Sequence, residues 1–194
     1  MKIDSYKYPE SSFLSIEKDM GILINLMLKN ENLKKLLYHN TNKCLSYPKL
    51  TEDETISLIG NNIKMVPKFK IDETIENYVL INFDSFTPNA NNTEFRDNTI
   101  VIDILCHYDQ WQLNDFQLRP YRIAAEIDTI LNNCRLSGIG KPQFARADRL
   151  SMGDEFGGLT LIYDVIHGEE DKKNSPSPMT EAELIANFNK MFNE

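Results

Sequence analysis

The 194-residue chain is poor in the residues that most often hold metals, form disulfides or build cofactor sites. It contains three cysteines, three histidines, one tryptophan and eight glycines. The cysteines at positions 44, 106 and 134 are odd in number and widely spaced, so they match no zinc, redox or disulfide pattern. Cys106 falls in an isoleucine-rich segment and Cys134 ends an amphipathic one. We therefore expect both to be buried apolar residues of a protein from a reducing compartment.

Positive charge and long apolar runs are also scarce. With 21 Lys+Arg against 29 Asp+Glu, the net charge is −8 at pH 7, which argues against proteins that grip nucleic-acid phosphates over a broad basic surface. No run approaches the length of a membrane span, and no apolar stretch follows the first residues, so we expect neither a membrane segment nor a signal peptide. The glycine-rich phosphate-binding motifs and the nucleophile elbow are missing, and no cofactor is expected.

Only one grouping of residues suggests metal chemistry. His107 and His167 lie in two predicted strands, and if those strands pair they could meet beside Asp103 or Asp109. Such a cluster would fit a metal-dependent hydrolase. The simpler interpretation, which we favour, is that both histidines lie at strand ends near solvent. The sequence therefore predicts no catalytic residue and no metal ligand, and the hydrolase stays an alternative.

Residues 1–61 are predicted to form a helical part that packs on the core. A helix should begin near Ser12 or Ser15, because apolar residues recur at helical spacing from Phe13 to Leu28. After an interruption at 29–30, a second helix is expected over about 31–38. A third, short helix is predicted by the Thr51-x-x-Glu54 capping box.

Residues 62–167 are predicted to form an α+β core domain. Alternating apolar residues predict strands, and a long apolar stripe that starts at Arg119-Pro120 predicts a helix to about residue 133. We expect a mostly antiparallel sheet of four or five strands with this helix packed on one face. The predicted strands are 62–70, 75–83, 98–108, about 142–148, and 158–167.

Two segments are candidate contact surfaces. Residues 84–97 read as a long loop, too rich in Asn, Pro and Thr for a regular element, yet they contain Phe86 and Phe95 beside Arg96 and Asp97. Long loops in compact domains are usually functional or disordered, and the aromatic residues predict that this one is held by its own domain or by a neighbour.

The second surface is the carboxyl-terminal end, where a polar linker (168–179) precedes a predicted amphipathic helix (180–194) opened by the capping box Thr180-x-x-Glu183. A helix this short is marginal alone in water, so its apolar stripe must be buried. It either folds back on its own domain or docks on a neighbouring subunit. The stripe consists of Leu184, Ile185, Phe188, Met191 and Phe192.

The order of these elements resembles that of phage tail terminator (tail completion) proteins, and more broadly of neck and head–tail joining proteins. The resemblance covers about residues 62–167. It is carried by the strand 98–108, the helix with RIAAEID, the turn LSGIG and the closing strand 158–167. The helical amino-terminal part and the linker-plus-helix end depart from compact terminators, which leaves open which ring of the neck the protein forms.

The resemblance implies a non-enzymatic virion protein of the neck or tail, assembled in the host cytoplasm. Its implied partners are further copies of itself in a hexameric ring, the tail-tube protein and the head-connector or stopper protein, with no sequence-specific nucleic acid and no membrane. A stopper or adaptor of the head–tail connector is the alternative within the same class. A third hypothesis is an acidic adaptor protein without ring symmetry.

Overall fold

The computed structural model describes residues 12–66, 76–88, 90, 95–132 and 140–168. It contains a five-stranded sheet with the order β1-β2-β3-β5-β4. β1 pairs with β2 in parallel, and every other neighbouring pair is antiparallel. The α+β class with a mostly antiparallel sheet is therefore confirmed in outline. The strands are β1 (Ile63–Lys64), β2 (Asn77–Pro88), β3 (Phe95–His107), β4 (Gln143–Met152) and β5 (Phe156–Gly168).

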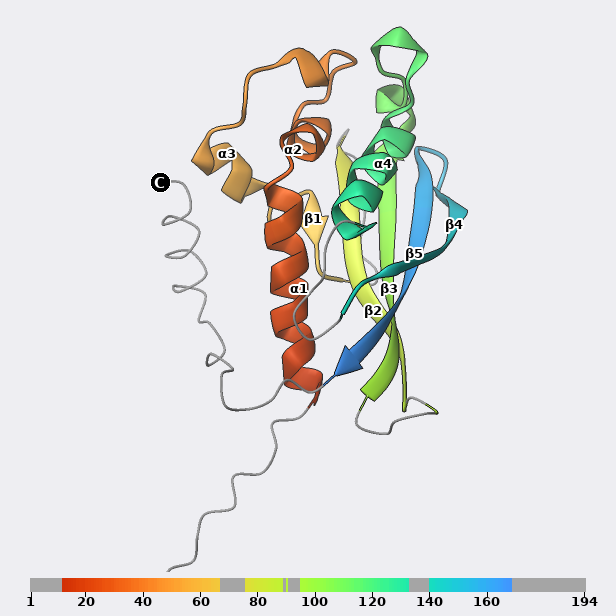
Figure 1. Ribbon diagram of the computed structural model, residues 1–194. Helices are drawn as coiled ribbons and strands as arrows, with labels where there is room; N and C mark the ends of the chain where they lie inside the picture. The colour runs from red at the N-terminus through yellow and green to blue at the C-terminus, as the bar shows by residue number, and fades with distance from the viewer. Residues whose placement is uncertain (1–11, 67–75, 89, 91–94, 133–139, 169–194) are drawn as a thin grey trace, which may run out of the picture.

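Four α-helices accompany the sheet in the described residues, and α1, α2 and α4 lie across one face of it (Figure 1). The alternate residues Ile100, Ile102 and Ile104 of β3 are completely buried on this face, in one apolar cluster with residues of the helices. The helices are α1 (Ser12–Leu28), α2 (Glu31–Tyr38), α3 (Glu52–Ser57) and α4 (Arg119–Asn132). None of the helices described is long and apolar enough to cross a membrane.

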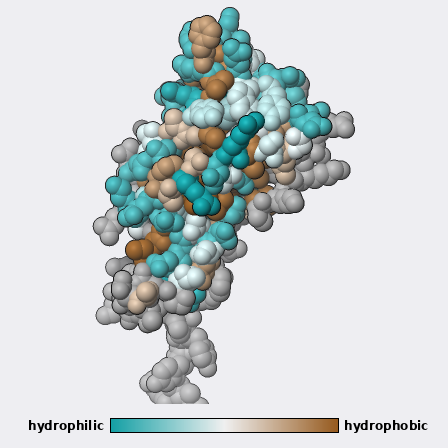
Figure 2. Space-filling model, turned by 90° about the vertical axis from the view of Figure 1, so that its right-hand side faces the viewer, coloured by the Kyte–Doolittle hydropathy of each residue, from teal (hydrophilic) through white to brown (hydrophobic). Residues whose placement is uncertain are grey.

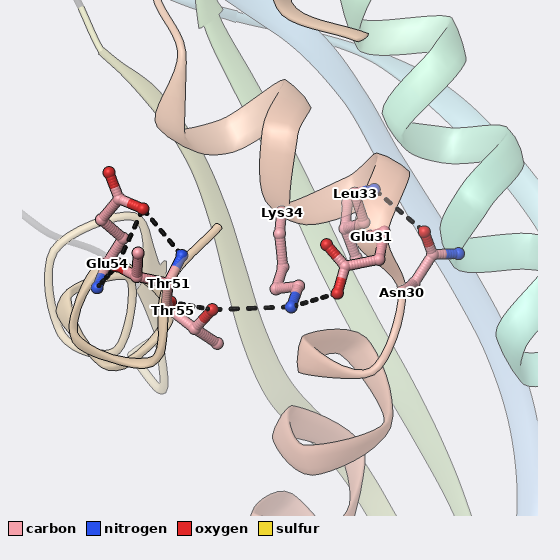
Figure 3. A network of polar contacts seen from close by, with 7 residues as sticks. All are labelled: Asn30, Glu31, Leu33, Lys34, Thr51, Glu54 and Thr55. Carbon is pink, nitrogen blue, oxygen red and sulfur yellow. Dashed lines mark hydrogen bonds and ion pairs between the residues drawn. The ribbon is translucent and has the colours of Figure 1, made fainter. Parts of the chain in front are cut away.

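Polar contacts join the short amino-terminal helices to each other (Figure 3). The Asn30 side chain caps α2 by accepting from the Leu33 N–H at 2.9 Å. The buried Lys34 ammonium lies 2.7 Å from the Glu31 carboxylate and 3.5 Å from Thr55 of α3. Burying a polar side chain costs free energy unless it is paired and hydrogen-bonded, and the contact of Lys34 with Thr55 joins α2 to α3.

The capping box predicted at the start of α3 is confirmed. The Thr51 hydroxyl accepts from the Glu54 N–H, and the Glu54 carboxylate accepts from the Thr51 N–H at 2.8 Å. The Thr51 hydroxyl also donates to this carboxylate at 2.9 Å, and the two hydrogen bonds that the carboxylate accepts from Thr51 lower the pKa of Glu54 below its ordinary value. The capping box satisfies two of the unpaired backbone donors at the start of α3, so the helix begins at a defined residue.

A buried arginine ties α4 to the chain that follows α2. Arg119, the first residue of α4, is completely buried. Its guanidinium donates to the carbonyl oxygens of Leu36 at 2.5 Å, His39 at 3.1 Å and Thr41 at 2.6 Å, and its Nε donates to Gln110 at 2.8 Å. Because the last carbonyls of a helix lack partners within it, Arg119 supplies donors that α2 and its exit loop require.

The structure corrects the predicted loop 84–97, most of which is strand. β2 continues to Pro88 and β3 starts at Phe95, with Thr87 opposite Asp97 and Pro88 opposite Arg96. A bulge between Asp84 and Thr87, with Ser85 at a φ of +60°, breaks the alternation of side chains. A bulge shifts the side-chain period by one residue, which is why the strand pattern could not be recognised in the sequence.

Other predicted boundaries also change. The strand expected over 62–70 is described only at β1, and residues 67–70 lie outside the described part of the chain. β4 continues to Met152, four residues beyond the predicted end. The helix 119–133, the helix over 31–38 and the strands near 98–108 and 158–167 are present within a few residues of their predicted bounds.

The buried cysteines give a first testable prediction. Cys44 and Cys106 are both free and completely buried, and burial raises the pKa of Cys106 to about 12. Because the thiolate is the reactive form, we expect neither residue to be alkylated by iodoacetamide at pH 8 in the folded protein. Peptide mapping by mass spectrometry should find both modified only after unfolding in urea. Modification of Cys106 at the rate of a free thiol in the native protein would contradict its burial.

Cys106 is thus the small buried apolar residue predicted from its segment, whereas Cys134 lies outside the described residues.

Candidate functional site: an edge strand, an apolar groove and a projecting loop

Strand β4 forms an exposed edge of the sheet. It pairs with β5 on one side, and no strand described in the structure lies on its other side. All residues from 143 to 149 are exposed, and a bulge lies between Phe144 and Arg146. The edge of a sheet presents backbone donors and acceptors that can pair with another chain, and bulges and charged residues limit such pairing to a fitting partner.

An open groove of about 560 Å³ lies between α4 and the strands β4 and β5. We call it the α4–β4 groove. Phe144 and Tyr121 are aromatic residues at this groove that are 49% and 56% exposed. The Phe144 ring meets the Tyr163 ring edge-on, with 5.6 Å between the ring centroids. The apolar part of the groove is formed by Tyr121, Ala124, Ala125, Phe144, Ala147 and Leu159.

Figure 2 faces the side of the molecule that carries β4, and there hydrophobic side chains lie among hydrophilic ones. Tyr121 and Phe144 are exposed and line one groove at this edge, and exposed apolar residues that share a groove are typical of a binding surface.

The groove contains only a few polar side chains among the described residues. The Tyr163 hydroxyl donates to Asp128 Oδ1 at 2.8 Å, and burial together with the Asp128 charge raises the pKa of Tyr163, so the phenol stays protonated. Arg149 also lines the groove, while the neighbouring Arg146 is paired with Asp148 at 2.9 Å. The groove therefore offers an apolar surface with one cation, Arg149, and one carboxylate, Asp128, that already accepts the Tyr163 hydrogen bond. A negative charge carried in with an apolar side chain would be attracted on the Arg149 side.

A third feature is the loop between β3 and α4, residues 108–118, which we call the β3–α4 loop and which stands at the top of Figure 1. Its tip carries Phe116, whose side chain is 94% exposed. Asp115 and Phe116 both have left-handed backbone conformations, with φ of 58° and 59°. This conformation costs roughly 1–3 kcal/mol for each non-glycine residue, and it persists only where the surrounding structure enforces it.

Contacts at the base of this loop hold Asp115 and Phe116 in that conformation. Gln112 and Leu118 form a β-bridge, and Leu113 is buried in the main core. The Asn114 N–H donates to the Asn42 carbonyl at 3.1 Å, and the Leu113 N–H donates to the Gln117 carbonyl at 2.8 Å. The loop is therefore anchored at both ends, and its aromatic tip is held out in solvent.

The structure contradicts the possible histidine metal cluster. β3 and β5 are antiparallel, with His107 opposite Phe156 and His167 opposite Arg96. The two histidines thus lie eleven register positions apart, which is about 35 Å along a strand. The two strands do pair, but their register separates the histidines. No group of metal-ligating residues occurs in the described parts of the chain.

The remaining members of that hypothesis have other contacts. Asp103 accepts a hydrogen bond from the Thr160 hydroxyl at 2.5 Å on the sheet face away from α4. His107 Nδ1 accepts from the Asp109 N–H at 3.2 Å. This local hydrogen bond caps the short turn that follows β3, which is a structural role.

The predicted interface residues near 84–97 are placed on the β2–β3 hairpin. Phe86 lies within the bulge of β2 and is partly buried, and Arg96 and Asp97 are partly buried in β3. Phe95 begins β3, and its side chain lies outside the described residues. The second predicted surface also lies outside them, at Leu184, Ile185, Phe188, Met191 and Phe192.

Sequence reasoning missed Phe116, Tyr121 and Phe144. Phe144 stands in a strand whose polar residues and bulge hide the alternation, and Tyr121 lies beside the recognised apolar stripe of α4. The signal that could have found Phe116 is the acidic and amide-rich segment from Asn114 to Gln117, in which it is the only apolar residue.

The YomW family model matches residues 30–165. The chain belongs to the YomW family. The matched region starts at the capping residue of α2 and ends in β5, so it contains the β3–α4 loop, the α4–β4 groove and the edge strand. The YomW family is a family of phage-derived proteins. A comparison with curated proteins finds no match.

Proposed function

We propose that this YomW-family protein is a structural virion protein of a tailed-phage neck. It acts as a tail terminator that caps the tail tube and joins it to the head connector as a ring. The observation that carries the proposal is the set of contact surfaces on one chain: an exposed edge strand, an apolar groove beside it and a projecting aromatic loop. Surfaces at different places on one chain suit repeated contacts between identical subunits.

Two further observations support this proposal. Membership of a phage-type family agrees with a virion component. The net charge of −8 suits a ring around a DNA passage, because an acidic wall repels the phosphates and lets the genome slide. The protein needs no cofactor for this task, and its partners are copies of itself, the tail-tube protein and the connector or stopper protein.

The ring predicts a defined mass in solution. We expect the purified full chain, alone or mixed with tail-tube subunits, to form a hexamer of about 134 kDa, which is six copies of 22.4 kDa. Size-exclusion chromatography with light scattering measures this mass, and negative-stain electron microscopy shows whether the particle is a closed ring. A monomer at every concentration, even with tail-tube subunits present, would contradict the proposal.

A stopper or adaptor of the head–tail connector is the second candidate, and the helices α1–α3 favour it because they add a helical layer to the sheet. Gold labelling of the protein in virions separates the two. A label between the tube end and the connector supports a terminator, and a label against the portal supports an adaptor.

A further inference from the structure

We infer that Phe116 of one copy inserts into the α4–β4 groove of a neighbouring copy, and that this contact joins the subunits. The inference rests on the proposed function, which supplies the ring, and it adds the contact that builds it. The occupant of the groove is thus a second copy of this chain, presented through its β3–α4 loop.

Exposure and preorganisation identify the inserting residue. The side chain of Phe116 is 94% exposed, whereas the next most exposed large apolar side chain in the described residues is that of Tyr121 at 56%. The loop is anchored by Leu113 and by the Asn114–Asn42 hydrogen bond, so its tip is already ordered. An ordered aromatic anchor loses little conformational entropy on binding, which is why such residues dominate protein interfaces.

The groove has the matching chemistry. Its alanine residues, Ala124, Ala125 and Ala147, leave space between α4 and β4, and Phe144 and Leu159 provide apolar contacts. Apolar pockets that receive an aromatic anchor are the usual centre of a tight interface.

Charge favours the same pairing. The β3–α4 loop contains Asp109 and Asp115 and no lysine or arginine. Arg149 lies in the groove and has no ion-pair partner in the described part of the chain, whereas the groove carboxylate, Asp128, accepts the hydrogen bond of Tyr163. Asp115 is adjacent to Phe116, so inserting the ring into the groove brings a carboxylate toward a guanidinium. Opposite charges at the rim orient an encounter and disfavour other partners.

The ring of the proposed function requires this contact to be head-to-tail. The loop precedes α4, whereas the groove runs along the side of α4 against β4 and β5. The same contact made reciprocally would close a two-fold dimer, whereas in the head-to-tail form each added copy keeps one loop and one groove free, so further copies add until the assembly closes. Such a contact generates a ring when the rotation between subunits closes.

The first test compares Phe116→Asp with the full wild-type chain by light scattering. We expect the variant to shift from the mass of the wild-type assembly to the 22.4 kDa monomer, with an unchanged circular dichroism spectrum. Ile56→Asp is the matched control, because Ile56 is an exposed apolar residue of α3, away from both surfaces. It should keep the wild-type mass. An assembly that survives Phe116→Asp would overturn the inference.

The second test uses a groove variant and a mixture. Ala125→Glu fills the groove from an exposed position of α4 and should also give a monomer. Phe116→Asp keeps an intact groove and Ala125→Glu an intact loop, so their equal mixture should form a dimer of about 45 kDa, twice 22.4 kDa, and no ring. A mixture that stays monomeric would contradict the head-to-tail contact.

A photo-crosslinking experiment locates the contact directly. Benzoylphenylalanine placed at position 116 should crosslink to peptides of α4 or β4 from another copy, as identified by mass spectrometry. Crosslinks to any other surface, or to the tail-tube protein alone, would overturn the inference.

These results separate the two proposals. A ring that survives Phe116→Asp contradicts the contact and leaves the ring function standing. An assembly other than a ring that Phe116→Asp dissolves supports the contact and contradicts the ring. A wild-type chain that is monomeric with and without tail-tube subunits contradicts both.

Discussion

Replacing Gly158 with alanine is expected to lower the free energy of unfolding by more than about 3 kcal/mol, or to prevent folding. Gly158 lies in β5 between Leu105 of β3 and Leu150 of β4, so its backbone is paired on both sides. A methyl group at this position would overlap the carbonyl oxygen of Ile104 and lie 2.8 Å from its carbonyl carbon. Because these are backbone atoms of a central strand, they cannot move aside as a flexible side chain would.

Urea denaturation followed by circular dichroism measures this loss, together with the soluble yield. Gly21→Ala is the matched control, because Gly21 is a helical residue of α1 and an added methyl group there meets no atom within 4 Å. Alanine exceeds glycine in helix propensity by up to about 1 kcal/mol, so the control should be neutral or stabilising. A Gly158→Ala variant as stable as Gly21→Ala would show that β3 and β5 are not packed as described.

Replacing Arg119 with methionine is the second large effect, and we expect a loss of about 3 kcal/mol in the free energy of unfolding. Methionine has a similar length but no donors, so it leaves the four carbonyl oxygens that Arg119 binds without that partner. Those carbonyls belong to α2, to its exit loop and to the β3–α4 loop. The variant should therefore loosen the attachment of α2 to α4 as well as the anchored loop.

The control for this variant is Arg122→Met on the same helix. Arg122 is 40% exposed and forms an ion pair with Glu126 at 3.0 Å, an interaction that contributes about 1 kcal/mol or less. In thermal and urea unfolding, the free energy of unfolding of Arg122→Met should be close to that of the wild type, and that of Arg119→Met should be well below it. Amide hydrogen exchange should become faster in 36–42 for Arg119→Met. Equal stability of the two variants would contradict the role assigned to the buried guanidinium.

Local patterns predicted the elements where one face of a helix or strand is buried. The isoleucines of β3 are completely buried, and so are Ile123, Ile127 and Leu131 of α4, because a regular period in the sequence places them on one side. The Thr51-Glu54 capping box was also recognised, since both of its partners lie within one turn. The β2–β3 hairpin was not, because the bulge at Ser85 interrupts the period of two.

The candidate site was recognised less well than the fold. The predicted loop 84–97 is mostly a hairpin, and the groove at Tyr121 and Phe144 was missed. Both of these residues are exposed, and exposed residues leave no periodic signal. Glu126 of α4 shows the same limit: a glutamate outside the apolar stripe of a helix is normally solvated, yet this one accepts hydrogen bonds from Asn30 and Asn32 and its side chain is only 12% exposed.

The sequence by itself determined the α+β class, most helix and strand positions and the scarcity of metal-ligating residues, because these depend on composition and short-range periodicity. Only the tertiary structure decided the register that holds His107 and His167 apart, the four carbonyls around Arg119 and the meeting of α4 with β4 in a groove. Each of these joins residues distant in the chain. Their proximity follows from strand order and helix packing, which no local pattern encodes.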